Sequence, residues 1–542
     1  QRNCTVFADG TADDFSVTNI AGGTIDAGGG NLGSGFAAEI GGAEDGANTF
    51  DIDNSVTIQG RGNGDAASGL AGDGVRIGNA GNTGTCEGAI SNSGDILSEG
   101  ANGSVAGFRA GNGVNFQGTL TNDGEISGVQ NGVYFGTGNH VGGSFVNTGL
   151  VSSDSRALNI DGTGLNVENA GTILGTGDQR NGTVYADGTA DNYTFTNTGL
   201  VDAGFGNNGA AVSLQTGEVD GDVVSAAVYN EGILQGRGDA EEGNTVGDGL
   251  RLFSNQEDAS FAGLVQNEGL IAGSAESDVA AGIRIDGGLD LLGAIINEGE
   301  ITGSVNAIDA TEAGDVTFVN DDEGVVNGNV LLGNGGDIVV DLGQINGVVD
   351  GGAGDDVLIA GDGDNVLVGG LGNDFIEGGD GVDTADFSDL DVAVTVALDA
   401  NGNGTATRDT GFTVRVDNVA IPNGTGASVQ PTNVTNGASF VAEAVGGNLY
   451  YNVHTSDFLG GEIRGQFAVV STAMDSHDSQ VITLQAELDG EQEVPPNDSE
   501  ATGTATLTIL FNPETGEASY STELTVSGLN EADLQTPAPT VA

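Results

Sequence analysis

Residues 121–128 read TNDGEISG, and nearly the same eight residues, INEGEITG, return at 296–303. Both copies contain the unit Asn-x-Gly-x-[Ile/Val/Leu], which follows a short apolar run. The unit occurs at Asn92, Asn122, Asn147, Asn169, Asn197, Asn230, Asn267 and Asn297, with looser copies at Asn19, Asn54 and Asn320. The spacing between successive units is 22 to 38 residues, which is typical of solenoids and propellers.

The local chemistry of the unit favours an all-β parallel β-helix. Strand-sized apolar runs, glycine turns and few helix-forming stretches fit such a solenoid. A four-stranded propeller blade, the alternative, needs about 40 residues of more even spacing. We expect the asparagine amides to form a ladder between coils, the glycine to supply a positive φ, and the Ile, Val or Leu to point into the core. Eleven units at roughly 4.8 Å per coil predict a rod on the order of 50 Å long.

The repeat is itself repeated at a larger scale. QRNCTVFADGTADDFSVTN at 1–19 returns as QRNGTVYADGTADNYTFTN at 179–197, with 13 of 19 positions identical. Later matches keep an offset of 178 to 175 residues. We therefore predict two homologous β-helix blocks, 1–178 and 179–345, and interpret the duplication as lengthening a rod. The pattern over these residues resembles the repeats of bacterial autotransporter passengers and large secreted adhesins.

The composition limits the partners of the chain. It contains 98 glycines, 79 acidic residues and 12 basic residues, all of them arginine, for a net charge of −67. Nucleic acids and anionic membranes would repel such a protein. No apolar run approaches the length of a membrane span, so we expect no membrane insertion. The charge suits a protein that is surrounded by salt or divalent cations.

A different and stricter period follows the β-helix blocks. Residues 351–386 read GGAGDDVLI, AGDGDNVLV, GGLGNDFIE and GGDGVDTAD, four consecutive nonapeptides of the form G-G-x-G-x-D-x-U-x. They resemble the RTX calcium-binding repeat, which implies a short parallel β-roll over about 346–390. Hard oxygen ligands on glycine-rich turns also suit Ca²⁺ on chemical grounds.

The resemblance implies that sixth-position side chains and turn carbonyls hold Ca²⁺ between successive coils. The sixth positions are Asp356, Asn365, Asp374 and Asp383. The turn glycines are Gly352, Gly354, Gly361, Gly363, Gly370 and Gly372. Asn365 keeps an oxygen ligand but lacks the charge, so its site is expected to be weaker. Rolls of this kind usually order only with metal, because the carboxylates otherwise repel one another.

The remaining sequence resembles a CHRD domain whose halves appear in reverse order. GNLYYNVHTSDFLGGEIRGQF at 447–467 resembles the closing half and ends a β-rich region over 391–470. After a linker at 471–480, residues 481–542 resemble the opening half, with its E-V-P-P and A-T-G-x-A elements. We predict an antiparallel β-sandwich-like region here. Three interpretations stay open: a tandem array cut short at Ala542, one circularly permuted sandwich, or strand exchange between subunits.

Cysteine and histidine give weaker indications. Cys4 and Cys86 are the only cysteines, and an even count in a secreted protein suggests a disulfide. The two lie over two coils apart, so either the N-terminal segment folds back over the cap or the bond joins two chains. His454 is expected to be a hydrogen-bonded histidine on a strand, and His140 and His477 to be solvated.

We do not expect this protein to be an enzyme. Many β-helices act on polysaccharides, but this chain has no lysine and no G-x-S-x-G or H-E-x-x-H motif. Its β-helix arginines, such as Arg61, Arg76, Arg237 and Arg251, stand at matching places in both blocks, which indicates repeated architecture rather than one active site.

The sequence thus predicts a non-enzymatic, extracellular bacterial structural protein. It would be a rod-like subunit of a surface layer, matrix fibre or filament that forms a homopolymer through its chain ends and is rigidified by Ca²⁺. The alternative is a segment of a calcium-dependent secreted adhesin that binds glycans or cell surfaces. RTX repeats are typical of a Gram-negative host with type I secretion.

Overall fold

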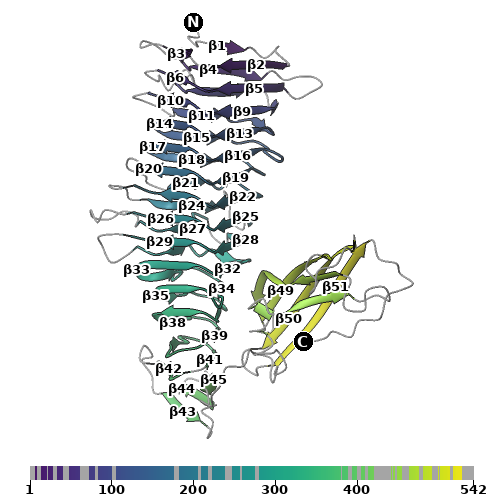
Figure 1. The fold of residues 1–542 in the computed structure, drawn as a ribbon. Coiled ribbons are helices and arrows are strands. Elements are labelled where there is room, and N and C mark those ends of the chain that lie inside the picture. The colour runs from purple at the N-terminus through teal and green to yellow at the C-terminus, as the bar shows by residue number, and fades with distance from the viewer. Residues whose placement is uncertain are drawn as a thin grey trace. The chain divides into compact units, whose positions relative to one another are not determined.

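The computed structural model describes residues 6–8, 14–20, 22–27, 33–40, 48–61, 72–79, 84–99, 105–175, 182–204, 209–217, 223–237, 247–256, 259–274, 280–379, 381–387, 394–398, 404–408, 413–419, 441, 444–445, 449–453, 463–474, 480–490, 499, 501–512 and 517–527. The chain forms two compact units. The N-terminal unit contains residues 1–261, 265–289 and 299–309, and the C-terminal unit contains 262–264, 290–298 and 310–542. Nearly every described element is a β-strand (Figure 1), which confirms the all-β prediction.

Each coil of the N-terminal unit contributes three short strands. The first strand ends at the asparagine of the repeated unit in β2 (Asp14–Asn19), β5 (Asn48–Asn54), β9 (Ala89–Asn92), β13 (Thr119–Asn122), β16 (Ser144–Asn147), β19 (Asn166–Asn169), β22 (Tyr193–Asn197), β25 (Val223–Asn230) and β28 (Ser260–Asn267), with short additions β8 (Gly84–Glu87) and β12 (Val114–Phe116). The second strands are β3 (Thr24–Asp26), β6 (Thr57–Gly60), β10 (Asp95–Ser98), β14 (Glu125–Gly128), β17 (Leu150–Ser153), β20 (Thr172–Gly175), β23 (Leu200–Asp202), β26 (Ile233–Gln235) and β29 (Leu270–Ala272). The third strands are β1 (Val6–Ala8), β4 (Phe36–Ile40), β7 (Val75–Asn79), β11 (Ala106–Ala110), β15 (Asn131–Phe135), β18 (Arg156–Ile160), β21 (Gly182–Ala186), β24 (Ala210–Thr216), β27 (Leu250–Ser254) and β30 (Ile283–Asp286), while β33 (Glu300–Asp309) pairs with both β29 and β30.

Equivalent strands of successive coils pair in parallel, as a β-helix requires. For example, Ile96 of β10 stands beside Ile126 of β14, and Ile126 stands beside Val151 of β17. The apolar residue of every strict repeat unit is fully buried, as predicted: Ile96, Ile126, Val151, Ile173, Val201, Leu234, Ile271 and Ile301. Aromatic rings also pack together in the core, as Phe116 and Phe135 do with centroids 5.3 Å apart and planes tilted by 59°.

The predicted asparagine ladder is confirmed. In the N-terminal unit each Asn Nδ2 donates to the Oδ1 of the next, from Asn19 to Asn267, over 2.7–2.8 Å. In the C-terminal unit the ladder runs from Asn297 through Asn320 and ends on the carboxylate of Asp341. From Asn92 to Asn267 each asparagine also donates to the carbonyl of the corner glycine two residues on, as Asn92 does to Gly94 at 3.0 Å. The buried amides are therefore satisfied from coil to coil.

The predicted reason for the corner glycine is wrong. Among the described residues, none of the corner glycines of the strict units has a positive φ. Space requires glycine there instead, because a Cβ on Gly124 would lie 2.0 Å from the carbonyl oxygen of Gly94. The same approach recurs one coil later, where a Cβ on Gly149 would lie 2.1 Å from the Gly124 oxygen. Glycine lets successive corners stack at strand spacing.

The C-terminal unit contains parallel coils of its own and then antiparallel strands. Its coils contain β31 (Asp290–Leu291), β32 (Ala294–Asn297), β34 (Thr317–Asn320), β36 (Ile338–Asp341), β39 (Val357–Ile359) and β41 (Phe375–Gly379) on one side, and β35 (Val325–Leu331), β37 (Gln344–Asn346), β38 (Val348–Asp350), β40 (Val366–Val368) and β42 (Thr384–Ala385) on the other. Three strands that pair in antiparallel order follow: β43 (Val394–Leu398), β44 (Gly404–Arg408) and β45 (Thr413–Val419). The last of them, β45, pairs in parallel with β41. The rest is β46 (Tyr450–Val453), β47 (Ile463–Gln466) and the antiparallel sheet of β48 (Ala468–Met474), β49 (Gln480–Leu488), β50 (Thr502–Asn512) and β51 (Glu517–Ser527).

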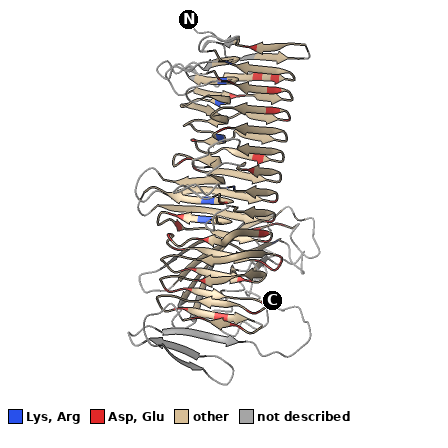
Figure 2. Cartoon of the chain, turned by 90° about the vertical axis from the view of Figure 1, so that its left-hand side faces the viewer, with Lys and Arg blue, Asp and Glu red and all other residues tan. Residues whose placement is uncertain are grey.

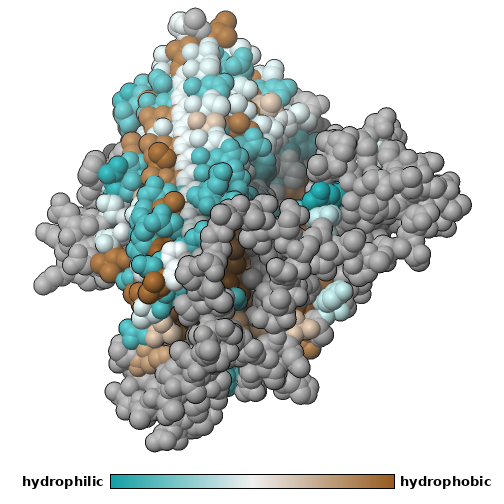
Figure 3. Space-filling model, turned by 60° about the horizontal axis from the view of Figure 1, so that its bottom comes forward, coloured by the Kyte–Doolittle hydropathy of each residue, from teal (hydrophilic) through white to brown (hydrophobic). Residues whose placement is uncertain are grey.

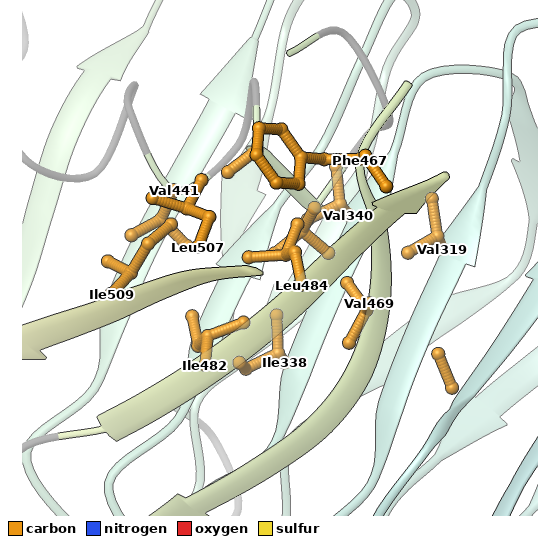
Figure 4. Packing of buried hydrophobic residues seen from close by; sticks show 14 of the residues in the cluster. Val319, Ile338, Val340, Val441, Phe467, Val469, Ile482, Leu484, Leu507 and Ile509 are labelled. Atoms are coloured by element: carbon orange, nitrogen blue, oxygen red, sulfur yellow. The ribbon is translucent and has the colours of Figure 1, made fainter. Parts of the chain in front are cut away.

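The antiparallel sheet uses the outer face of the coils in its own unit as the second layer of a sandwich. Figure 4 shows Val319 and Val340 of the coils packed with Leu484 and Val469 of the sheet. The Oγ1 atoms of Thr317 and Thr472 are 3.1 Å apart across the same contact. Coil residues directly before the ladder position face outward by strand alternation. They are apolar in this unit (Ile296, Val319, Val340), whereas Ser91, Thr121, Glu168 and Thr196 of the N-terminal unit are polar.

The two predicted CHRD halves lie together within the chain. Arg464 of β47 and Asp489, directly after β49, exchange backbone hydrogen bonds of 2.9 and 3.1 Å. Ile463 and Phe467 from the closing half share one buried cluster with Leu484 and Leu507 from the opening half. Of the three interpretations left open by the sequence, this geometry favours one permuted sandwich inside a single chain.

Candidate metal centre

The nonapeptide segment forms a roll with two residue columns, because two nonapeptides complete one coil. Val357 of β39 pairs with Phe375 of β41, and Val348 of β38 pairs with Val366 of β40, so the register is 18 residues. Residues at the same nonapeptide position therefore stack when they are 18 apart. Asp356 falls in one column with Asp374, and Asn365 falls in the other with Asp383.

The sixth-position side chains contact the next coil directly. The backbone N–H of Asp356 donates to Asp374 Oδ1 over 3.3 Å, and that of Asn365 donates to Asp383 Oδ1 over 3.0 Å. Asn365 Nδ2 also lies 3.4 Å from Asp383 Oδ1. The structure thus brings the predicted residues together as two pairs, rather than as one group of four.

The turn glycines bring backbone carbonyls close to each column. Gly352, Gly354, Gly363, Gly370 and Gly372 all have positive φ, between 83° and 148°. A Cβ on Gly370 would lie 1.9 Å from the Gly352 oxygen, and one on Gly372 would lie 1.6 Å from the Gly354 oxygen. Gly361 is not among the described glycines with a positive φ. Its carbonyl oxygen nevertheless lies close to the next coil, because a Cβ on Gly379 would be 2.2 Å from it. Stacked carbonyls of this kind are suitable Ca²⁺ ligands.

The glycine that begins three of the four repeats is required for a separate reason; the second repeat begins with Ala360. A Cβ on Gly351 would lie 2.5 Å from Asp356 Oδ2, and a Cβ on Gly369 would lie 2.5 Å from Asp374 Oδ2. The carboxylate therefore folds back over its own turn, where a larger residue would displace it. This contact explains why these repeats have glycine at their first position.

The carboxylates are buried without a compensating cation from the protein. Asp356 is 0% and Asp374 is 1% exposed. No donor in the described part of the chain reaches Oδ2 of Asp356 or Asp383. Burial, followed by the charges of Asp337 and Asp374, raises the pKa of Asp356 well above its usual range. A buried carboxylate whose oxygen lacks a donor needs a proton or a metal ion, so the residues fit Ca²⁺.

The ligand set has to combine side chains with backbone. No group of three or more His, Cys, Asp or Glu side chains in the described residues is placed to hold a metal ion. Two carboxylates of one column, supplemented by turn carbonyls, would hold Ca²⁺, and the ion would bind coil to coil. The column of Asn365 and Asp383 offers one charge fewer, so it would bind Ca²⁺ more weakly.

The column of Asp356 and Asp374, which is called the first column below, contains one further residue that the sequence analysis did not identify. Asp337 is 0% exposed, and its backbone N–H donates to Asp356 Oδ1 over 2.9 Å. The signal was present: LGNGGDIVV at 332–340 is a nonapeptide with leucine in place of the first glycine. The interval from Asp337 to Asp356 is 19 residues rather than 18, which hides the copy from a strict period.

His140 corrects a second expectation. It is fully buried rather than solvated, and its Nδ1 accepts the backbone N–H of Phe116 over 3.1 Å while Nε2 lies 2.9 Å from the Gly136 oxygen. Burial lowers the pKa of His140, which favours the neutral ring. His454 and His477 lie outside the described residues.

The predicted disulfide stays a prediction. Cys86 is buried in β8, which follows β7, and β7 is two coils from β1. Cys4 lies outside the described residues.

Several arginines at matching places make matching ion pairs, although Arg76 pairs with Asp73 and its counterpart Arg251 pairs with Asp286. Arg109 contacts buried Asp73 at 3.2 Å in the first block, and Arg284 contacts buried Asp248 at 3.0 Å in the second. Figure 2 shows the basic residues spread over several strands, and some stand on neighbouring strands, as Arg76 does beside Arg109 and Arg251 beside Arg284. Arg61 and Arg237 likewise form ion pairs with Asp26 and Asp202. Repetition of the same contacts supports an architectural role.

Comparison with known families agrees with both sequence resemblances. The RTX calcium-binding nonapeptide repeat matches residues 350–385, and the CHRD domain matches residues 377–467 and 484–542. The RTX family binds Ca²⁺, so the predicted cofactor is confirmed. No significant match was found among curated proteins or among solved structures. No helix in the described residues has the length and apolarity that a membrane span requires.

Proposed function

We propose that this protein is a non-enzymatic extracellular structural protein, a rod-like subunit of a bacterial surface layer, matrix fibre or filament. The observation that carries the proposal is the continuation of one coil design into a calcium roll. The asparagine ladder, corner glycines and paired ion contacts recur through both blocks. A solenoid that repeats contacts in this way builds length. RTX repeats are typical of secreted proteins, which supports an extracellular location.

Open strand edges support assembly through the chain ends. Among the described residues, β1 pairs only with β4 and β2 only with β5. At the opposite end of the sequence, β51 is the outer strand of its sheet. Such edges join other chains readily unless they are covered.

Surface character also favours edges over an apolar interface. Exposed large hydrophobic side chains are scattered, including Ile20, Val141, Val305 and Leu371. On the face shown in Figure 3, apolar and polar residues of the described chain are interspersed. With a net charge of −67, association would require screening, and Ca²⁺ supplies it.

Electron microscopy in negative stain tests the assembly. We expect filaments or sheets in a few millimolar Ca²⁺ that disperse after EGTA and return when Ca²⁺ is restored. Mg²⁺ at the same ionic strength is the control for simple screening. Single particles under all conditions would refute the polymer.

The alternative function is a segment of a calcium-dependent adhesin that binds glycans or cell surfaces. The calcium-binding repeats fit this alternative as well.

Glycan-array binding by single chains in Ca²⁺ tests the adhesin. Binding that appears in Ca²⁺ and is lost after EGTA would support it. An array without signal would remove this alternative.

A further inference from the structure

The turn at 332–337 has the same backbone geometry as the calcium turns of the roll. Gly335 has a φ of 147°, close to 141° at Gly354 and 148° at Gly372. Asn334 forms a parallel bridge with Ala353, as Ala353 does with Leu371. This turn lies outside the residues that match the RTX family.

The hydrogen bonds of that turn also repeat those of the roll. Gly335 N–H donates to the Ala353 oxygen over 2.8 Å, and Gly354 N–H donates to the Leu371 oxygen over 2.7 Å. A Cβ on Gly354 would lie 1.5 Å from the Gly335 oxygen, which matches the 1.6 Å between Gly372 and Gly354. The row of turn carbonyls beside the column of Asp356 and Asp374 therefore extends one coil before the matched repeats.

Asp337 completes the turn with a carboxylate in the same position. Its Oδ1 accepts the N–H of Val316 over 2.7 Å, just as Asp356 Oδ1 accepts that of Asp337. Its Oδ2 is buried, and no described donor reaches it. Val316 occupies the equivalent position in the preceding coil. The column of acidic residues therefore begins at Asp337.

The surroundings of Asp337 are acidic and dry. The charged groups that face it are Asp315 and Asp356, and Asp374 lies one coil further. None of the ion pairs in the described residues involves Asp337 or Asp356. Two adjacent carboxylates at 0% exposure cannot both be charged without a cation between them.

We propose that Asp337 and Asp356, with turn carbonyls such as those of Gly333 and Gly335, bind a further divalent cation of the Ca²⁺ class. This site joins the matched repeats to the coil above them. Asp337 and Asp356 directly precede Ile338 and Val357, which belong to the buried cluster under the antiparallel sheet. Binding at this site would therefore also stabilise the docking of the sheet. The proposal depends on calcium binding by the repeats and does not depend on assembly.

Calcium titration of two matched variants by isothermal calorimetry tests the site. Asp337→Asn keeps the size of the side chain but removes one charge. Asp341→Asn removes a buried charge from the same coil, at a ladder position that asparagine occupies in other coils. We expect Asp337→Asn to lose one bound ion or to bind it at least about tenfold more weakly, and Asp341→Asn to retain the count of the unmodified chain.

Two results would overturn the proposal. One is an unchanged ion count and affinity in Asp337→Asn, which would mean that the buried carboxylates share a proton instead. The other is an equal loss in both variants, which would mean that any charge removal in this coil disturbs the roll.

Hydrogen exchange on the unmodified chain gives an independent test that requires no variant to fold. Amides of 332–340 should gain protection on Ca²⁺ addition together with those of 351–359. Exchange at 332–340 that ignores Ca²⁺ while 351–359 responds would contradict the site. Electron microscopy of the same samples separates this outcome from the assembly proposal.

Discussion

Removal of one ladder asparagine should destabilise the coil around it strongly. Asn147 is 0% exposed; its Nδ2 donates to Asn169 Oδ1 over 2.7 Å and its Oδ1 accepts from Asn122 over 2.8 Å. In Asn147→Ala, Asn122 Nδ2 keeps the carbonyl of Leu150 at 3.1 Å. Asn169 Oδ1, by contrast, loses its only donor among the described residues. The damage is therefore one orphaned acceptor plus a small cavity.

The magnitude follows from these two terms. A buried acceptor without a donor costs about 1–3 kcal/mol, and the cavity left by the amide adds roughly 1 kcal/mol. We expect the free energy of unfolding to fall by about 2–4 kcal/mol in total. Asn166→Ala is the matched control, because its Nδ2 donates only to Glu168 Oε1 at an exposed site. That variant should change stability by less than about 0.5 kcal/mol.

Urea unfolding followed by circular dichroism, together with hydrogen exchange at 144–153, measures the effect. Local exchange matters because a long stack of coils need not unfold in one step. A loss below about 1 kcal/mol in Asn147→Ala, or equal losses in the two variants, would show that the ladder does not stabilise the solenoid. The neighbouring coils should lose protection more than distant ones.

Three further changes test other parts of the structure. Gly124→Ala places a Cβ 2.0 Å from a carbonyl oxygen of the neighbouring coil, whereas Gly142→Ala meets nothing within 4 Å and only strains a φ of 87°. Thermal unfolding should show the larger drop in melting temperature for Gly124→Ala. Equal drops would contradict the argument that the corner glycine is needed for close approach. Val340→Asp buries an unpaired charge under the antiparallel sheet, at a position that is 0% exposed. Proteolysis of residues 468–527 should accelerate at least about tenfold. An unchanged rate of cleavage would refute the packing of this sheet against the coils of its unit. Without Ca²⁺, the raised pKa of Asp356 means that stability is retained below about pH 4 and lost as pH rises through the folded pKa. The increase in melting temperature on Ca²⁺ addition should then be larger at about pH 7.5 than at about pH 4.5, and equal increases would contradict this linkage.

The sequence by itself determined the parts of the fold that repeat locally. The Asn-x-Gly unit specified a coil because each coil contacts only its neighbours, so one motif contains the information for every interface. The nonapeptide period likewise located the sixth positions, Asp356, Asn365, Asp374 and Asp383, whereas their division into two columns follows from the 18-residue register of the structure. The calcium chemistry followed from the residue types.

Only the tertiary structure decided the features that depend on stacking across unequal intervals. Asp337 joins the first column after 19 residues, and His140 is buried because the chain folds it against Phe116 and Phe135. Corner glycines are needed for contacts with the previous coil, which no single unit reveals. The docking of the antiparallel sheet pairs Thr317 with Thr472, 155 residues away. Such contacts have no period, and burial alone selects them, so the one-dimensional pattern could not predict them.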